Sequence, residues 1–153
     1  MIVIIGLGNP LRQDEGIAVR LIEELRPRFA TRQDVHLVDI GTSGLRLLDE
    51  LEGADAAIIV DCALMGEPPG IVVRFTRKEA ETQRDSASIS PHTGDLMRIV
   101  DLATDLGHCP DDLIFFGIEP AALGYDIGLS PALESRVPEY CDLIEAEVAR
   151  LTP

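Results

Sequence analysis

The chain has 153 residues, enough for one domain with a buried core, and hydrophobic residues make up 46% of it. It carries 27 acidic against 13 basic residues, which gives a formal net charge of -14. Such a charge repels nucleic acid and anionic membranes, so it excludes both as partners and favours a cation or a basic partner. We therefore predict a single domain over residues 1–153.

The sequence contains neither a membrane anchor nor a secretion signal that we recognise. No apolar run approaches the roughly 20 residues that span a bilayer, and Met1 leads directly into a strand-like segment. The cysteines Cys62, Cys109 and Cys141 are widely spaced and form neither a disulfide framework nor a zinc motif. These features predict a reduced, cytoplasmic protein. The absence of heptads favours a monomer.

Short apolar runs alternate with amphipathic segments along the chain. In the first half of the chain the pattern predicts a strand over Ile2 to Leu7, a helix over Asp14 to Phe29, a strand over Val35 to Ile40, and a short helix that is capped by Thr42 or Ser43 and ends at Leu51. Two further strands follow, over Ala56 to Val60 and Ile71 to Phe75, and then a polar loop over Arg77 to Ser90. The remainder is predicted to form a helix over Leu96 to Leu106, a strand over Leu113 to Ile118, a turn-rich segment over Glu119 to Pro131 and a helix over Pro138 to Leu151.

This order predicts an α/β fold with three layers, in which helices cover both faces of a five-stranded, mostly parallel sheet. The short link between the third and fourth strands predicts that one strand runs antiparallel. In such sheets, sites form beyond the carboxyl ends of the strands. The segment from Gly8, the segment Asp39 to Gly44, and Asp61 all follow strand ends, so we expect them to share one crevice.

The first strand is followed by the turn Gly6-Leu7-Gly8 and, six residues later, by the carboxylate pair Asp14-Glu15. The outline is that of a nucleotide-binding turn, which binds phosphate through free backbone amides and a helix N-terminus. Two carboxylates at this place repel an anion and attract a cation. Alternatively, Glu15 only stabilises the helix dipole.

Asp61 and His92 are the other candidate metal ligands. Asp61 closes a buried strand, where a carboxylate is costly unless it is paired or binds a cation, although it can also cap a turn. His92 lies just ahead of a predicted helix, where a solvated histidine is the alternative. Together with Glu15 they offer the carboxylate and imidazole ligands that suit a first-row transition metal.

Two other types of chemistry remain open at this point. Asp39, which closes the second strand, could hold a ribose in a nucleotide-binding enzyme, but the first turn lacks the third glycine of the dinucleotide fingerprint and has Leu11 in its place. Cys62 could act as a nucleophile with His92 as its base, although a buried cysteine is the more usual case.

At these residues the sequence resembles the nickel-iron hydrogenase maturation endopeptidases over nearly its whole length. The matching motifs are Gly8-Asn9 with Asp14-Glu15-Gly16, the box Asp39-Ile40-Gly41-Thr42-Ser43-Gly44, the strand that ends in Asp61, the loop Ser90-Pro91-His92, and the segments Gly117-Ile118-Glu119-Pro120 and Ile127-Gly128-Leu129-Ser130. Several motifs in the same order are far more specific than any one of them.

The resemblance implies a twisted five-stranded sheet between helices and metal contacts at Glu15, Asp61 and His92. It implies an endopeptidase that removes the C-terminal extension of a hydrogenase large-subunit precursor after nickel insertion, with the nickel supplied by that precursor. Glu15 or Asp61 is then the candidate base, and Asp39 a candidate catalytic or positioning group. A non-catalytic chaperone that binds the nickel site would use the same residues.

Overall fold

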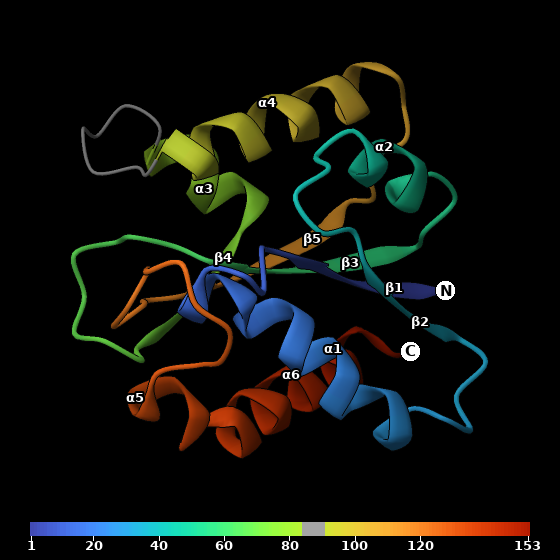
Figure 1. Cartoon of the computed structure of the whole chain (residues 1–153). Helices are drawn as coiled ribbons and strands as arrows, with labels where there is room; N and C mark the ends of the chain where they lie inside the picture. The colour runs from blue at the N-terminus through green and yellow to red at the C-terminus, as the bar shows by residue number, and fades with distance from the viewer. Residues whose placement is uncertain (84–90) are drawn as a thin grey trace.

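A five-stranded sheet forms the centre of the computed structural model, which describes residues 1–83 and 91–153, without the side chains of residues 83 and 91–93 (Figure 1). The strands are β1 (Ile2–Leu7), β2 (Val35–Asp39), β3 (Ala56–Cys62), β4 (Val72–Thr76) and β5 (Asp112–Ile118). Their order is β2-β1-β3-β5-β4, and only the β4–β5 pair is antiparallel. This confirms the predicted mostly parallel sheet with one antiparallel strand.

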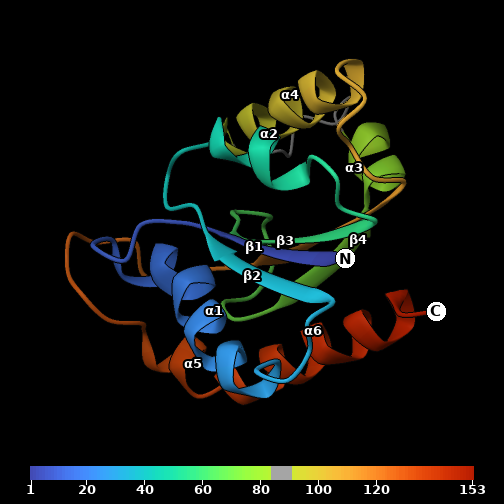
Figure 2. The ribbon, with the colours of Figure 1, turned by 90° about the vertical axis from the view of Figure 1, so that its right-hand side faces the viewer.

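Helices cover both faces of the sheet, as Figures 1 and 2 show. One face is covered by α1 (Ile17–Arg28), α5 (Pro131–Glu134) and α6 (Val137–Leu151), and the other by α2 (Arg46–Leu51), α3 (Arg77–Gln83) and α4 (Pro91–Asp105). A 3-10 helix, η1 (Gln13–Gly16), precedes α1. The predicted three-layer α/β/α fold class is confirmed. No helix in the described part of the chain combines the length and apolarity that a membrane crossing requires.

The continuous apolar run of β1 reflects burial on both sides. Ile2 and Ile4 belong to the core beneath α1 and α6, whereas Val3 and Ile5 belong to the core beneath α2 and α4. Successive side chains of a strand point to opposite faces, so a strand covered by helices on both sides must be apolar at every position. The same rule explains β3 and β5.

The prediction of a polar loop from residue 77 onward is wrong for Arg77–Gln83, which forms α3. Thr76 and Glu79 form a reciprocal capping box. The amide of Thr76 donates to Oε2 of Glu79 at 2.7 Å, and the amide of Glu79 donates to Oγ1 of Thr76 at 3.3 Å. These bonds satisfy backbone donors that a helix start leaves free. Residues 84–90 of the predicted loop lie outside the described residues.

The short helix near residue 46 also differs from the prediction. It begins at Arg46 after Leu45, with no side-chain cap from Thr42 or Ser43. Leu47 and Leu51 are fully buried, but Leu45 lies outside the helix and is 70% exposed. A large apolar side chain remains in the solvent beside the end of β2.

Candidate active site

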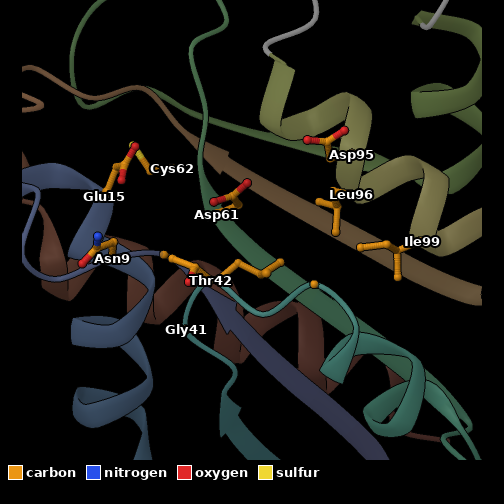
Figure 3. Close-up of a pocket in the computed structure, with 12 residues that line it drawn as sticks. Asn9, Glu15, Gly41, Thr42, Asp61, Cys62, Asp95, Leu96 and Ile99 are labelled. Carbon is orange, nitrogen blue, oxygen red and sulfur yellow. The ribbon is translucent and has the colours of Figure 1, made fainter.

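A pocket of about 290 Å³ lies at the carboxyl edge of the sheet, beside α4 (Figure 3). The register places Leu7 opposite Asp61 and Gly6 opposite Asp39, so the ends of β1, β2 and β3 meet at this edge, as predicted. The residues that line the pocket are Leu7, Gly8, Asn9, Glu15, Gly41, Thr42, Gly44, Asp61, Cys62, Asp95, Leu96 and Ile99.

Glu15 reaches the pocket from η1, and the turn before it is tightly packed. The amide of Asn9 donates to the carbonyl oxygen of Glu15 at 3.1 Å. A Cβ atom at Gly8 would lie 2.0 Å from that same oxygen, so only glycine fits there. The Glu15 side chain is 19% exposed, and its Oε1 lies 3.4 Å from Nη1 of Arg12. The backbone therefore fixes where this carboxylate enters the pocket.

Asp14 points away from the pocket, so the expected acid pair does not act as one cation site. Its side chain is fully buried and accepts four hydrogen bonds. Oδ2 accepts from the amides of Ala121 and Ala122, each at 2.9 Å, and from the hydroxyl of Ser130 at 2.8 Å. Oδ1 accepts from the amide of Ser130 at 2.7 Å. Asp14 thus anchors the segment that follows β5.

Asp61 enters the pocket from the end of β3 with a strongly perturbed carboxyl group. Burial is the largest cause that raises its pKa to about 7; the negative charge of Glu15 raises it further, and a hydrogen bond from the Cys62 amide acts against both. Figure 3 shows Glu15 and Asp61 facing the same pocket from separate elements. The Asp61 carboxyl therefore resists ionisation beside Glu15, which makes the pocket receptive to a proton or a cation.

Cys62 lines the pocket but is a poor nucleophile. Its pKa is raised well above the ordinary thiol value, first by burial and then by the negative charges of Asp61 and Glu15. A nucleophilic cysteine needs the opposite surroundings, in which positive charge lowers the pKa and stabilises the thiolate. This environment argues against the cysteine-nucleophile interpretation.

Asp39 closes β2 but does not line the pocket. Its Oδ1 accepts a hydrogen bond from the amide of Gly41 at 2.8 Å, and Gly41 has a φ of +59°. The side chain therefore stabilises the turn that carries Gly41 and Thr42 into the pocket wall. Its catalytic or positioning role stays a prediction.

His92 is the second residue of α4, and its side chain lies outside the described residues. The next turns of the same helix contribute Asp95, Leu96 and Ile99 to the pocket. Among the described side chains, no group of three or more His, Cys, Asp or Glu residues forms a metal site. The metal role of Glu15, Asp61 and His92 therefore stays a prediction.

The turn after β1 offers no phosphate cradle. Every backbone amide from Gly8 to Glu15 donates within the chain; the acceptors include the carbonyl oxygens of Gly41, Ala122 and Asp126 and the side chain of Asn9. A phosphate site needs free amides at this place. The geometry argues against the nucleotide-binding alternative.

Three pocket residues were not singled out in the sequence. Leu96 and Ile99 occupy apolar positions of an amphipathic helix, where they read as ordinary core residues, and Asp95 reads as an acid near a helix start. The local sequence pattern carries no signal that α4 lies against the end of β3. Tertiary packing alone places them in the pocket.

Several known proteins that are similar to this chain in sequence and fold are named as hydrogenase maturation proteins. A family model described as hydrogenase maturation protease matches residues 19–147, a range that includes Asp39, Asp61 and His92 and begins four residues after Glu15. The hydrogenase 2 maturation protease of Escherichia coli is 31% identical over 136 residues, which cover 89% of this chain and 83% of that protein.

A second relative is longer. The hydrogenase expression/formation protein HupD of Thiocapsa roseopersicina is 33% identical over 138 residues, which cover 89% of this chain but 62% of that protein. Among solved structures, the hydrogenase maturating endopeptidase HybD from E. coli superposes with a TM-score of 0.84 at 28% identity, covering 97% of this chain and 92% of that one. The likeness extends over sequence and fold together.

Proposed function

Because this chain belongs to the hydrogenase maturation protease family, we propose that it is an endopeptidase that removes the C-terminal extension of a nickel-iron hydrogenase large-subunit precursor. We further propose that the cut depends on metal and follows nickel insertion, with the nickel supplied by the precursor. We expect the chain to act as a monomer in the cytoplasm. The name of the E. coli relative, hydrogenase 2 maturation protease, supports the substrate class.

The pocket that Glu15 and Asp61 share is the observation that carries this proposal. Within the described residues no lysine or arginine forms an ion pair with Asp61, and burial and Glu15 raise its pKa to about 7. An incoming cation would relieve the cost of two carboxylates in one pocket. A nickel ion already held by the precursor is such a cation.

We propose that Glu15 and Asp61 meet this nickel as carboxylate ligands, with His92 as the third ligand. Carboxylate and imidazole groups without thiolates bind a free ion less tightly than a thiolate-containing site does. They can still complete the coordination of an ion that arrives with the precursor's cysteines. Nickel-loaded precursor would then bind better than empty precursor, and this difference in affinity provides the checkpoint.

In the hydrolytic step, water adds to the scissile carbonyl carbon, the C–N bond breaks, and the leaving amine gains a proton. The nickel ion would polarise the carbonyl or a bound water. Asp61, or Glu15, takes the proton from the attacking water and returns it to the amine. Asp39 acts on the same edge by holding the turn at Gly41.

The first prediction is tested with a large-subunit precursor prepared with and without nickel, by measuring the loss of C-terminal mass. We expect cleavage of the nickel-loaded form alone. Glu15→Gln and Asp61→Asn should lower the rate about 10²-fold or more. A matched control is Asp112→Asn, an exposed acid at the amino end of β5, which should cleave like the wild type.

Cleavage of the nickel-free precursor at the same rate would contradict the checkpoint. Undiminished cleavage by Asp61→Asn would contradict the assignment of the site. Nickel-dependent binding without turnover would instead favour the non-catalytic chaperone, because that function needs the same ligands but no base.

A further inference from the structure

Large apolar side chains are exposed around the pocket. In the described part of the chain nine large hydrophobic residues are exposed, and five of them lie in loops after the carboxyl ends of the parallel strands. We call these five the apolar rim: Leu11 after β1, Leu45 after β2, Leu64 after β3, and Tyr125 and Ile127 after β5. Figure 2 shows the loops after β1, β2 and β5 gathered on its left side.

The backbone segment that carries the most exposed members of the rim is anchored to η1 by hydrogen bonds. Tyr125 is 89% exposed and Ile127 is 78% exposed. The residue between them, Asp126, accepts a hydrogen bond through its carbonyl oxygen from the amide of Gln13 at 2.9 Å. Further bonds from this segment to Gln13 and Asp14 fix it to η1. Because the segment is fixed in advance, binding through it costs little ordering entropy.

A single side chain connects this part of the rim to the candidate site. The guanidinium of Arg12 lies 4.8 Å from the centre of the Tyr125 ring, and its Nη2 donates to the carbonyl oxygen of Leu123 at 2.9 Å. Its Nη1 lies 3.4 Å from Oε1 of Glu15. Tyr125 and Glu15 are therefore two contacts of the same residue, so this part of the rim adjoins the pocket.

We propose that the apolar rim is the docking surface for the folded body of the large-subunit precursor, around the point where its C-terminal extension enters the pocket. This inference rests on the proposed function. A pocket of about 290 Å³ is at the lower end of the size of ligand sites, about 300–1,000 Å³, so a protein substrate must gain affinity outside it. Exposed rigid aromatic and apolar residues supply that affinity in protein interfaces.

Charge identifies the chemistry of the partner surface. The pocket inside the rim is lined by the carboxylates of Glu15, Asp61 and Asp95, and the whole chain carries -14. A complementary surface is an apolar patch flanked by basic side chains. The rim thus selects a precursor that presents such a patch next to its extension.

The test uses the double variant Tyr125→Ser/Ile127→Ser and the control pair Leu102→Ser/Leu106→Ser. The control residues are 44% and 53% exposed; Leu102 lies in the last turn of α4 and Leu106 directly after it, at the opposite edge of the sheet. With nickel-loaded precursor as substrate, we expect the rim variant to raise KM and Kd at least about tenfold and to change kcat far less. The control pair should match the wild type.

The single variant Ile127→Ser leaves the contact of Tyr125 with Arg12 in place. It replaces the double variant in the test if the double variant does not fold. Unchanged KM and Kd in the rim variants, or an equal rise in the control pair, would overturn the docking surface. Binding of the precursor (Kd) and its cleavage (loss of C-terminal mass) are measured separately. If the wild type binds the precursor without cutting it, the peptidase proposal fails while the Kd values still decide the rim.

Discussion

At the residue scale, two adjacent acids have opposite surroundings. Asp14 is fully buried and accepts four hydrogen bonds from Ala121, Ala122 and Ser130, whereas Glu15 faces the pocket beside Arg12. Buried carboxylates are tolerated when each lone pair finds a donor. Asp14 therefore holds the loop that carries Tyr125, and Glu15 remains available for chemistry.

Replacing Asp14 by alanine should lower stability far more than replacing Glu15. The change removes the buried acceptor of three partly buried amides and one hydroxyl, at a cost of roughly 3–5 kcal/mol. For a chain of this size that is a fall in Tm of roughly 10 °C. Glu15→Ala should cost about 1 kcal/mol or less, because its ion pair is long and partly exposed. Thermal unfolding of both variants checks this; equal losses would contradict it.

At the element scale, α6 is fastened to the antiparallel strand β4 by an ion pair. Arg74 of β4 donates to Glu147 of α6 at 2.7 and 2.9 Å, and Arg150 donates to the same carboxylate at 2.9 Å. Glu147 is 6% exposed. The hydrogen bond from Arg74 is the largest cause that lowers its pKa to about 2, with burial opposing and Arg150 assisting.

This ion pair predicts a loss of stability in acid. The pKa of Glu147 is about 2 in the folded chain against 4.5 ordinarily, so the folded state binds this proton less readily than the unfolded state. The stabilisation is present above about pH 4.5 and is lost as the pH falls toward 2. Glu147→Gln should therefore be less stable than the wild type by about 2 kcal/mol at pH 7, and this difference should shrink by pH 3.

Denaturant unfolding at both pH values measures this difference. Arg74→Gln provides a second test, since it removes the main partner and should reproduce most of the loss at pH 7. A difference between Glu147→Gln and the wild type that is the same at pH 3 and pH 7 would assign the effect to packing and contradict the ionic origin.

At the scale of the whole molecule, acidic charge predominates. The chain has 27 acidic and 13 basic residues, so 14 acids would remain uncompensated even if every base were paired. Repulsion among the excess acids opposes the compact state, and salt screens it. The same net charge favours a basic partner.

The Tm of the purified chain should accordingly rise, by a few degrees, between about 0.02 and 0.3 M NaCl at pH 7, because Debye screening shortens from roughly 20 Å to about 6 Å. Differential scanning calorimetry measures the change. A fall in Tm with salt would mean that surface pairs such as Arg28 with Asp142 outweigh the general repulsion.

The sequence alone determined most of the layers of the fold. Continuous apolar runs specify strands covered on both faces, and amphipathic segments specify the helices between them. Glu15, Asp39 and Asp61 could be named as candidates because Asp39 and Asp61 lie at the carboxyl ends of strands and Glu15 follows the turn after the first strand, and strand ends of a parallel sheet meet at one edge. The capping-box residues Thr76 and Glu79 also indicate the start of helix α3 in the sequence, but the polar composition of the segment led to the prediction of a loop.

Only the tertiary structure decided which acid of the pair Asp14-Glu15 faces the pocket. The donors to Asp14 come from residues 121, 122 and 130, more than 100 positions away, so no local pattern could separate Asp14 from Glu15. The wall formed by Asp95, Leu96 and Ile99 and the rigid exposure of Tyr125 arise in the same way. Periodicity reports the short-range geometry of the backbone, whereas burial and hydrogen-bond partners depend on segments that only folding brings together.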